Sequence, residues 1–333
     1  MKKIIIKFYI IFLLVTISGC ETSKSINYDL NVNKVSTKTH RITSDTEILG
    51  SIDSSGIYKW LGIPYAEKPI NDLRWRAPRE IENYSKKYEA ISFKKPCVQF
   101  QSSLTNNGLV KPGAIIGSED CLYLNIYSPA LSKDQISRDN INLPVMVWIH
   151  GGGNTTGMPS EYNPELFVKS EKIIFVSIAY RLGIFGWLSH PELREQDGID
   201  SSSNFGLLDQ IMALKWIKEN IQFFGGNPNN ITIFGESAGG QNVIALYSSP
   251  LAKGLFDRAI SQSGGTSVTS VKDAEKINRS DPDYISSYKN RHVTTEEWVN
   301  ILNKKGLITS KFGEKDNLYD LRSLDSSALM SGI

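Results

Sequence analysis

The chain has few of the residues that bind metals or build disulfide networks, with three cysteines and four histidines in 333 residues. It contains no metal-ligand spacing, no phosphate-binding glycine loop and no basic patch. The formal net charge is only +2, so the charge balance gives no reason to expect nucleic acid as a partner. We therefore expect no metal, no cofactor and no nucleic acid.

A hydrophobic run long enough to span a membrane is also missing. Residues 4–17 are apolar, but about fourteen residues fall short of the roughly twenty that a spanning helix needs. Lysines flank this run, as in a secretory signal, and Ile-Ser-Gly-Cys at residues 17–20 resembles a bacterial lipobox. We expect a signal peptide at 1–19, a lipidated Cys20 that anchors an exported lipoprotein to the membrane, and a polar tether at 20–40. The alternatives are an uncleaved anchor, or a plain signal with an incidental cysteine.

The remaining residues, 41–333, have the pattern of one α/β domain. Residues 143–149 and 173–179 are continuous apolar runs, typical of strands that are covered on both faces. Residues 204–224 repeat apolar side chains at helical spacing and end at two glycines, and Asn204 can cap the start. Two β-prone pieces within residues 48–65 surround a turn signal at 53–56 and predict an antiparallel hairpin. We also predict strands at 231–234 and 258–263 and helices at 238–247, 294–305 and 318–330.

The most informative motif is Gly-Glu-Ser-Ala-Gly at residues 235–239, which directly follows the strand predicted at 231–234. G-x-S-x-G between a strand and a helix is the nucleophile elbow, whose serine hydroxyl stands clear of the sheet edge. Upstream, His150 and the glycines at 151–153 close another apolar strand, where a loop can offer backbone amides to an oxyanion. These two parts predict acyl transfer with Ser237 as nucleophile.

Several further segments resemble the type-B carboxylesterases, the cholinesterase-like branch of the α/β-hydrolases. Residues 224–240 resemble the serine-site signature of that family, and Glu-Asp-Cys-Leu-Tyr-Leu-Asn-Ile at 119–126 resembles its second signature. The segments 61–66, 73–75, 179–183, 204–210 and 256–260 also match, and the resemblance is dense from 47 to 265. It implies an α/β-hydrolase fold, a mostly parallel sheet flanked by helices, and a serine hydrolase that cleaves a small-molecule carboxylic ester.

The resemblance also assigns roles to residues around the motif. It places the oxyanion donors at the backbone of Gly152, Gly153 and Ala238. Glu236 should be a buried carboxylate that supports the histidine or a cationic leaving group, or else a structural hydrogen-bonding group. His150 should brace the glycine loop. Asn154 departs from the family, which often has an aromatic residue after the third glycine, so the pocket lining differs here.

Covalent and ionic links follow from the same resemblance. Cys97 and Cys121 should form the N-terminal disulfide of the family, the alternative being two buried thiols. Arg74 should pair with Glu119, and Arg181 with Asp120. Residues 111–117 lack the aromatic side chain that binds quaternary ammonium in cholinesterases, so a choline ester is not the expected substrate.

The acid and the histidine of the triad are not evident. The family places both after the serine, each behind a later strand, whereas residues 266–333 contain no further apolar strand run. We expect His40 in the tether and His190 in a loop, and His292 is the one histidine after Ser237. The sequence therefore predicts that the C-terminal strands, the acid and the base lie beyond residue 333. The alternatives are a non-catalytic cholinesterase-like binding domain, an inactive fragment of an interrupted gene, or His292 as the base.

Overall fold

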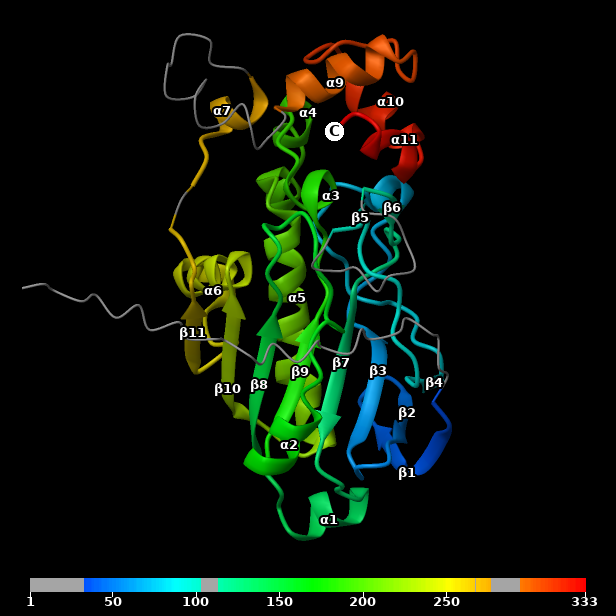
Figure 1. The fold of residues 1–333 in the computed structure, drawn as a ribbon, viewed down its shortest axis with the longest axis vertical. Coiled ribbons are helices and arrows are strands. Elements are labelled where there is room, and N and C mark those ends of the chain that lie inside the picture. The colour runs from blue at the N-terminus through cyan, green and yellow to red at the C-terminus, as the bar shows by residue number, and fades with distance from the viewer. Residues whose placement is uncertain (1–32, 103–112, 267, 277–293) are drawn as a thin grey trace, which may run out of the picture.

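A large mixed sheet forms the centre of the molecule (Figure 1). The computed structural model describes residues 33–333 apart from 103–112, 267 and 277–293. Within this part the strand order is β1-β2-β3-β7-β9-β8-β10-β11, and β4 pairs with β2 outside that path. The strands are β1 Val35–Ile42, β2 Glu47–Ile52, β3 Tyr58–Pro64, β4 Lys87–Glu89, β7 Tyr123–Ser128, β8 Leu143–Ile149, β9 Ile174–Ile178, β10 Gly226–Glu236 and β11 Arg258–Gln262, with β5 Gln99–Phe100 and β6 Ile115–Ile116 in a separate small sheet.

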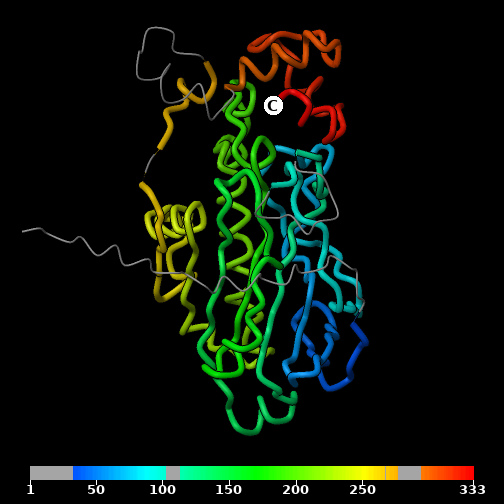
Figure 2. Tube along the Cα trace, in the orientation of Figure 1, coloured from blue at the N-terminus to red at the C-terminus, as the bar shows by residue number. Residues whose placement is uncertain are grey.

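The sheet consists of an antiparallel part and a parallel part. The pairs β1–β2, β2–β3, β3–β7 and β7–β9 are antiparallel. The pairs β9–β8, β8–β10 and β10–β11 are parallel. The α/β class, the N-terminal hairpin and the strands predicted near 143–149, 173–179 and 258–263 are thus confirmed. Figure 2 follows the chain from the blue hairpin across the sheet to the yellow β10–α6–β11 unit.

The hairpin turn forms where the sequence predicts it. Asp53 Oδ1 accepts hydrogen bonds from the backbone N–H of Ser55 at 2.8 Å and of Ile57 at 3.0 Å. Gly56 follows with φ +83°, a left-handed conformation that costs glycine little. The carboxylate of Asp53 therefore satisfies two backbone N–H groups of the turn that joins β2 to β3.

The folded domain begins earlier than the predicted boundary at residue 41. Strand β1 starts at Val35 and pairs antiparallel with β2, so residues 35–40 belong to the sheet and not to a tether. His40 lies in this strand, and its Nε2 is 3.2 Å from Glu47 Oε2. Buried Arg41 links the strand to the segment before α1 (Lys133–Arg138), because its Nη2 donates a hydrogen bond to the carbonyl of Leu131 at 2.6 Å. The sequence of β1 has no regular alternation of polar and apolar residues, so the strand cannot be recognised without its pairing partner.

Helices cover both faces of the sheet. The side chains of Val147 and Val176 lie in the main core with α5, whereas the adjacent Trp148 and Phe175 pack with Val168 of α2 in a second cluster. Successive strand residues point to opposite faces, so α5 and α2 lie on opposite sides. The helices are α1 Lys133–Arg138, α2 Glu165–Glu171, α3 Gly183–Trp187, α4 Pro191–Arg194, α5 Phe205–Asn220, α6 Ala238–Ser248, α7 Val271–Glu275, α9 Thr295–Lys304, α10 Asn317–Ser323 and α11 Ser326–Met330.

The helix predicted at 204–224 is confirmed with two differences at its ends. α5 ends at Asn220 and continues as a 3-10 turn from Ile221 to Phe224, before Gly225 at φ +90°. Asn204 stands at the N-cap position but forms no side-chain cap hydrogen bond. Its Nδ2 donates instead to the carbonyl of Ser202 at 3.1 Å, so the amide is used in the preceding turn.

The C-terminal helices form a cap at the end of the molecule toward which the parallel strands point (Figure 1). α9 confirms the helix predicted at 294–305, and residues 318–330 form two helices instead of one. The break lies at Leu324, which has extended dihedrals and whose carbonyl accepts a hydrogen bond from Arg74 Nη1 at 2.7 Å. A contact from the N-terminal half of the chain thus interrupts the helical pattern.

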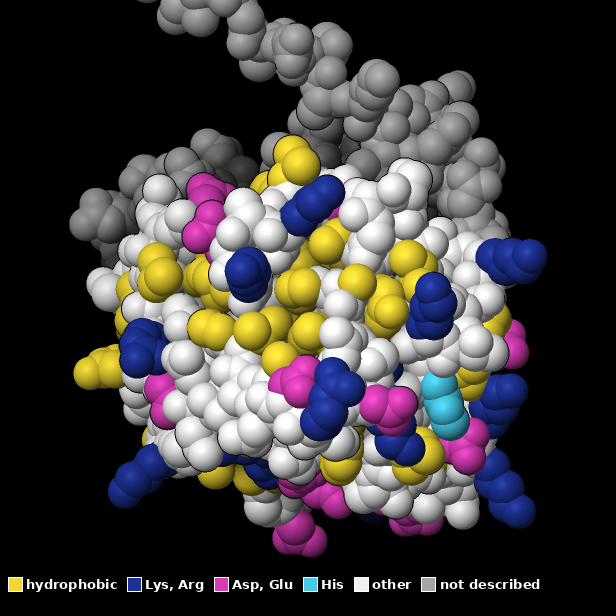
Figure 3. Space-filling model, turned by 90° about the horizontal axis from the view of Figure 1, so that it is seen from below, with side chains coloured by type: hydrophobic (Ala, Val, Ile, Leu, Met, Phe, Trp, Pro, Cys, Tyr) yellow, Lys and Arg dark blue, Asp and Glu magenta, His cyan; other side chains and the backbone are white. Residues whose placement is uncertain are grey.

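The opposite end of the molecule exposes a hydrophobic area (Figure 3). At this end α2 exposes Leu166 to 83% and Phe167 to 39%. Among the described helices, none has the length and hydrophobicity needed to cross a bilayer. The described residues also contain no cluster of three or more His, Cys, Asp or Glu side chains suited to a metal ion.

Candidate active site

Ser237 occupies the sharp turn between β10 and α6. Its dihedrals are φ 56° and ψ −120°, which a non-glycine residue rarely adopts. The glycines around it are required by close packing: a Cβ on Gly239 would lie 2.1 Å from the carbonyl oxygen of Ile149, and one on Gly235 would lie 2.6 Å from the same oxygen. The turn is therefore pressed against the end of β8, where a side chain larger than hydrogen does not fit.

The hydroxyl of Ser237 is available for chemistry. The residue is exposed, and within the described residues no hydrogen bond engages its Oγ. Its backbone is well anchored, because its N–H donates to the carbonyl of Gln262 at 2.9 Å and its carbonyl accepts from the N–H of Gln241 at 2.9 Å. A fixed backbone with an unbonded hydroxyl is the arrangement expected of a serine nucleophile.

The glycine loop after β8 lies directly beside this turn. A Cβ on Gly151 would lie 2.7 Å from the carbonyl oxygen of Glu236 and 3.4 Å from Cβ of Ser237. Gly152 and Gly153 follow at φ +93° and +64°. The loop that contains Gly152 and Gly153 thus begins against the turn of Ser237, and Ala238 directly follows the serine.

His150 lies under the loop and not in the site. It is 1% exposed, its Nδ1 is 2.9 Å from the carbonyl oxygen of Gly151, and its ring stacks on Tyr180 at 4.3 Å. The Tyr180 hydroxyl donates to the carbonyl of His150 at 2.5 Å. Burial lowers the pKa of His150 to about 4, so the ring is neutral at physiological pH. These contacts fit the predicted bracing role.

None of the described histidines reaches Ser237. His40 is paired with Glu47 on the antiparallel side of the sheet. His190, predicted in a loop, is buried at the N-cap of α4, where its Nε2 lies 2.9 Å from Asn317 Oδ1. Burial lowers its pKa as well. His292 lies outside the described residues. The described residues therefore contain the serine predicted as nucleophile and the loop predicted to hold the oxyanion donors, but no histidine in contact with that serine.

Comparison with known proteins agrees with this geometry. The model of the carboxylesterase family matches residues 33–307. The chain belongs to the carboxylesterase family. It is 41% identical over 231 residues to a cocaine esterase of Oryctolagus cuniculus, covering 67% of this chain and 41% of that protein. It is 42% identical over 232 residues to para-nitrobenzyl esterase of Bacillus subtilis (strain 168), covering 68% of this chain and 44% of that protein.

Solved structures of the family show the same fold. A thermophilic pNB esterase superposes with a TM-score of 0.69 at 32% identity, covering 89% of this chain and 53% of that one. A carboxylesterase of Geobacillus stearothermophilus superposes with a TM-score of 0.67 at 32% identity, covering 88% and 52%. The chain thus spans about half the length of these solved relatives and less than half of the curated relatives above.

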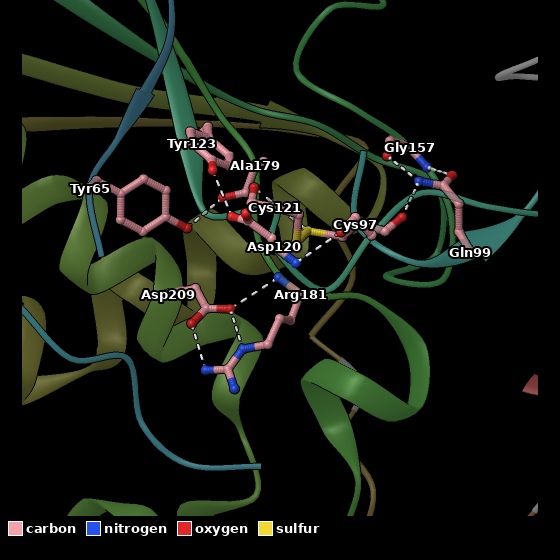
Figure 4. Close-up of a disulfide and its surroundings, with 11 residues drawn as sticks. Tyr65, Cys97, Gln99, Asp120, Cys121, Tyr123, Gly157, Ala179, Arg181 and Asp209 are labelled. Atoms are coloured by element: carbon pink, nitrogen blue, oxygen red, sulfur yellow. Dashed lines mark hydrogen bonds and ion pairs between the residues drawn. A yellow bond between two sulfur atoms is a disulfide. The ribbon is translucent and has the colours of Figure 1, made fainter. Parts of the chain in front are cut away.

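A disulfide joins Cys97 to Cys121, as the family resemblance implies (Figure 4). Next to it, Gln99 is fully buried and reaches the glycine loop: its Nε2 donates to the carbonyl of Gly157 at 2.9 Å, and its Oε1 accepts from the N–H of Gly157 at 2.8 Å. The same Oε1 accepts from the Thr156 hydroxyl at 2.7 Å. The disulfide segment therefore supports the far end of the loop.

One of the two predicted ion pairs is confirmed. Arg74 binds Glu119 through two hydrogen bonds of 2.5 and 2.6 Å.

The other predicted pair is wrong. Arg181 pairs with Asp209 of α5 at 2.7 and 2.8 Å and not with Asp120 (Figure 4). Asp209 is fully buried and also accepts a hydrogen bond from the backbone N–H of Arg181 at 3.0 Å. Its negative charge compensates the charge of Arg181, which is excluded from water. Asp120 accepts instead from the Tyr123 hydroxyl and pairs with Lys68.

The sequence does not predict the exposure of two carboxylates near the site. Glu236, predicted to be buried, is exposed, because it ends β10 beside the outermost strand β11, whose five residues are all exposed. Glu161, which no sequence signal indicates, is partly buried, and its buried Oε1 has no hydrogen-bond partner among the described residues. Burial raises its pKa to about 7. The charges of Glu161 and Glu236 both raise the pKa of Tyr162, after the larger effect of burial.

Proposed function

We propose that this protein hydrolyses small-molecule carboxylic esters through an acyl-enzyme on Ser237. The observation that carries the proposal is the strained backbone of Ser237, φ 56° and ψ −120°, in contact with the glycine loop. Strain of this kind persists only where the surrounding structure over-determines it, and it concentrates at functional sites. Relatives named cocaine esterase and para-nitrobenzyl esterase support an ester as the substrate class.

The proposed reaction has two steps, acylation of the serine and hydrolysis of the acyl-enzyme. Ser237 Oγ attacks the carbonyl carbon while a base takes its proton, and the negative charge that forms on the carbonyl oxygen is stabilised by the N–H groups of Gly152, Gly153 and Ala238. The intermediate collapses, the alcohol leaves with the proton from the base, and an acyl-serine ester remains. Water, activated by the same base, then releases the carboxylic acid and restores the serine.

We further propose that the base and the acid lie outside the described residues, in a segment that follows residue 333 in the intact protein. The coverage of less than half of the curated relatives supports this proposal. The alternative base is His292, and the alternative function is a binding domain without catalysis.

Turnover of p-nitrophenyl acetate tests these assignments. We expect the 333-residue chain to be weak or inactive and a version extended with the following segment to be fast, with activity lost in Ser237→Ala. Loss of a triad member removes several orders of magnitude from kcat. Fast turnover by the 333-residue chain that disappears in His292→Ala would identify His292 as the base. Fast turnover that survives Ser237→Ala would overturn the serine mechanism.

We also propose that the protein is a lipoprotein anchored at the membrane through Cys20, which lies outside the described residues. The support is the lipobox-like sequence at residues 17–20. Several acyl chains on one cysteine anchor a protein stably, whereas a single chain does not. Membrane fractionation should find native protein in the membrane and Cys20→Ala unprocessed or released. Normal processing and membrane retention of Cys20→Ala would contradict the anchor.

A further inference from the structure

We propose that Asn154 and Asn242 are positioning residues that lock the oxyanion loop onto the nucleophile helix α6. The inference rests on the proposed function, because the geometry it protects is that of an oxyanion hole. Neither side chain belongs to the motifs that predicted the site.

The two side chains form a reciprocal amide pair. Asn242 Nδ2 donates to Asn154 Oδ1 at 2.8 Å, and Asn154 Nδ2 donates to Asn242 Oδ1 at 3.3 Å. Asn242 is 4% exposed and lies in α6, five positions after Ser237, whereas Asn154 directly follows the three consecutive glycines 151–153. A buried amide is costly without partners, so this pair satisfies both groups while it joins the two elements.

The loop needs an external constraint because its glycines have more conformational freedom than other residues. Gly152, Gly153 and Asn154 have φ values of +93°, +64° and +57°, three left-handed residues in succession. Asparagine tolerates this region better than other residues that carry a Cβ. The carbonyl of Asn154 is also fixed, since it accepts from the N–H of Gly183 at 2.7 Å.

The other supports of the loop come from the body of the domain. Tyr180 binds the carbonyl of His150 at the start of the loop, and Gln99 binds Gly157 at its end. The amide pair reaches α6 itself. This matters because the expected oxyanion donors lie on both elements: Gly152 and Gly153 on the loop, and Ala238 at the start of the helix. The distance between these donors depends on how firmly the loop and the helix are held together. A displacement of the donors by about 1 Å can lower the rate about a hundredfold.

The test compares Asn242→Ala, Asn154→Gly and the double variant in the extended protein, the version that the proposed function expects to be fast. Asn154→Gly removes the amide and keeps a residue that accepts positive φ, so it separates the bridge from backbone strain. Asn140→Gly is the matched control, because Asn140 also has positive φ, +48°, and is exposed away from the site. Two quantities are measured: hydrogen exchange of the amides at residues 151–158, and kcat and KM for p-nitrophenyl acetate.

We expect each single variant to speed exchange in the loop about tenfold or more, and to lower kcat about tenfold with KM little changed. The double variant should resemble the single ones, because one bridge is lost in each case. Asn140→Gly should match the native chain. Loop exchange in Asn242→Ala and Asn154→Gly equal to that of Asn140→Gly would overturn the proposal.

Exchange and turnover separate the two claims. If native protein shows no turnover that depends on Ser237, the proposed function fails, while the exchange data still decide whether the bridge holds the loop. If native turnover is present and both single variants keep native kcat, the positioning role is wrong even where exchange rises. If Asn242→Ala does not fold, Asn154→Gly at the half-exposed loop position provides the same comparison.

Discussion

The two sides of Ser237 are built differently. On the side of β8, the end of the strand is buried, and hydrogen bonds from Tyr180, Gln99 and Asn242 hold the partly exposed loop that follows it. On the side of β11, all five strand residues are exposed, as are Glu236 and Ser237. The loop that we propose as the oxyanion loop is thus held by hydrogen bonds from three other elements, whereas the side of β11 offers an exposed strand and no histidine among the described residues.

The largest effect should come from the glycines that pack the elbow against these two sides. A Cβ on Gly239 would lie 2.1 Å from the carbonyl oxygen of Ile149, on the oxyanion side, and one on Gly240 would lie 2.7 Å from the carbonyl oxygen of Gln262, in β11. We expect Gly239→Ala to lower the free energy of unfolding by about 4 kcal/mol, and Gly240→Ala by roughly half of that because an exposed edge strand can shift. Urea unfolding followed by circular dichroism measures both. Equal losses would show that the two sides are equally rigid.

Loss of the disulfide should weaken the oxyanion side next. Cys97 and Cys121 are 24 residues apart, and closure of a loop of this size is worth about 3 kcal/mol on a chain-entropy model. The variant Cys97→Ser with Cys121→Ser should lose about this much, and hydrogen exchange should rise at Gly157, which Gln99 binds beside the disulfide. Reduced native protein is the matched control. A double variant as stable as the oxidised native protein would contradict the prediction.

Glu161 should make stability depend on pH. Its pKa is raised from 4.5 to about 7 by burial, so the folded state binds the proton more tightly than the unfolded state. Stability therefore falls as pH rises from about 4.5 to about 7, and the penalty is complete above that range. We expect Glu161→Gln to raise the free energy of unfolding by roughly 2 kcal/mol at pH 8 and to change little at pH 4.

Exposed Glu80 offers the control for this measurement. Glu80→Gln should leave the unfolding free energy unchanged at both pH values, because an exposed carboxylate keeps its hydration. A gain for Glu161→Gln that is the same at pH 4 and pH 8 would point to packing and not to charge as its cause.

The smallest effect should be found on the open edge. Ile260 in β11 is 46% exposed, whereas Ile178 in β9 is fully buried. We expect Ile260→Ala to cost about 0.5 kcal/mol and Ile178→Ala about 3 kcal/mol in thermal or urea unfolding of the 333-residue chain. The same two variants can be measured in the extended protein. A larger loss of unfolding free energy for Ile260→Ala there would show that the added segment covers β11.

Much of the fold could be predicted because its signals are local. Continuous apolar runs marked β8 and β9, helical spacing marked α5, and the glycine pattern marked both the elbow and the loop. These features depend on neighbours within a few residues along the chain, where backbone hydrogen bonding and turn geometry restrict the choice. The strand β1 was missed because its pairing with β2, and not its own pattern, makes it a strand.

The sequence by itself determined the serine, the glycine loop and the order of the elements around them. Only the tertiary structure decided which distant side chains meet: Arg181 with Asp209 and not Asp120, His190 with Asn317, and Asn154 with Asn242, 88 residues apart. It also decided that Oε1 of Glu161 is buried and that Glu236 is exposed. The physical reason is that polar partners are chosen by distance and by exclusion from water after the sheet has assembled, and neither quantity is encoded in local spacing.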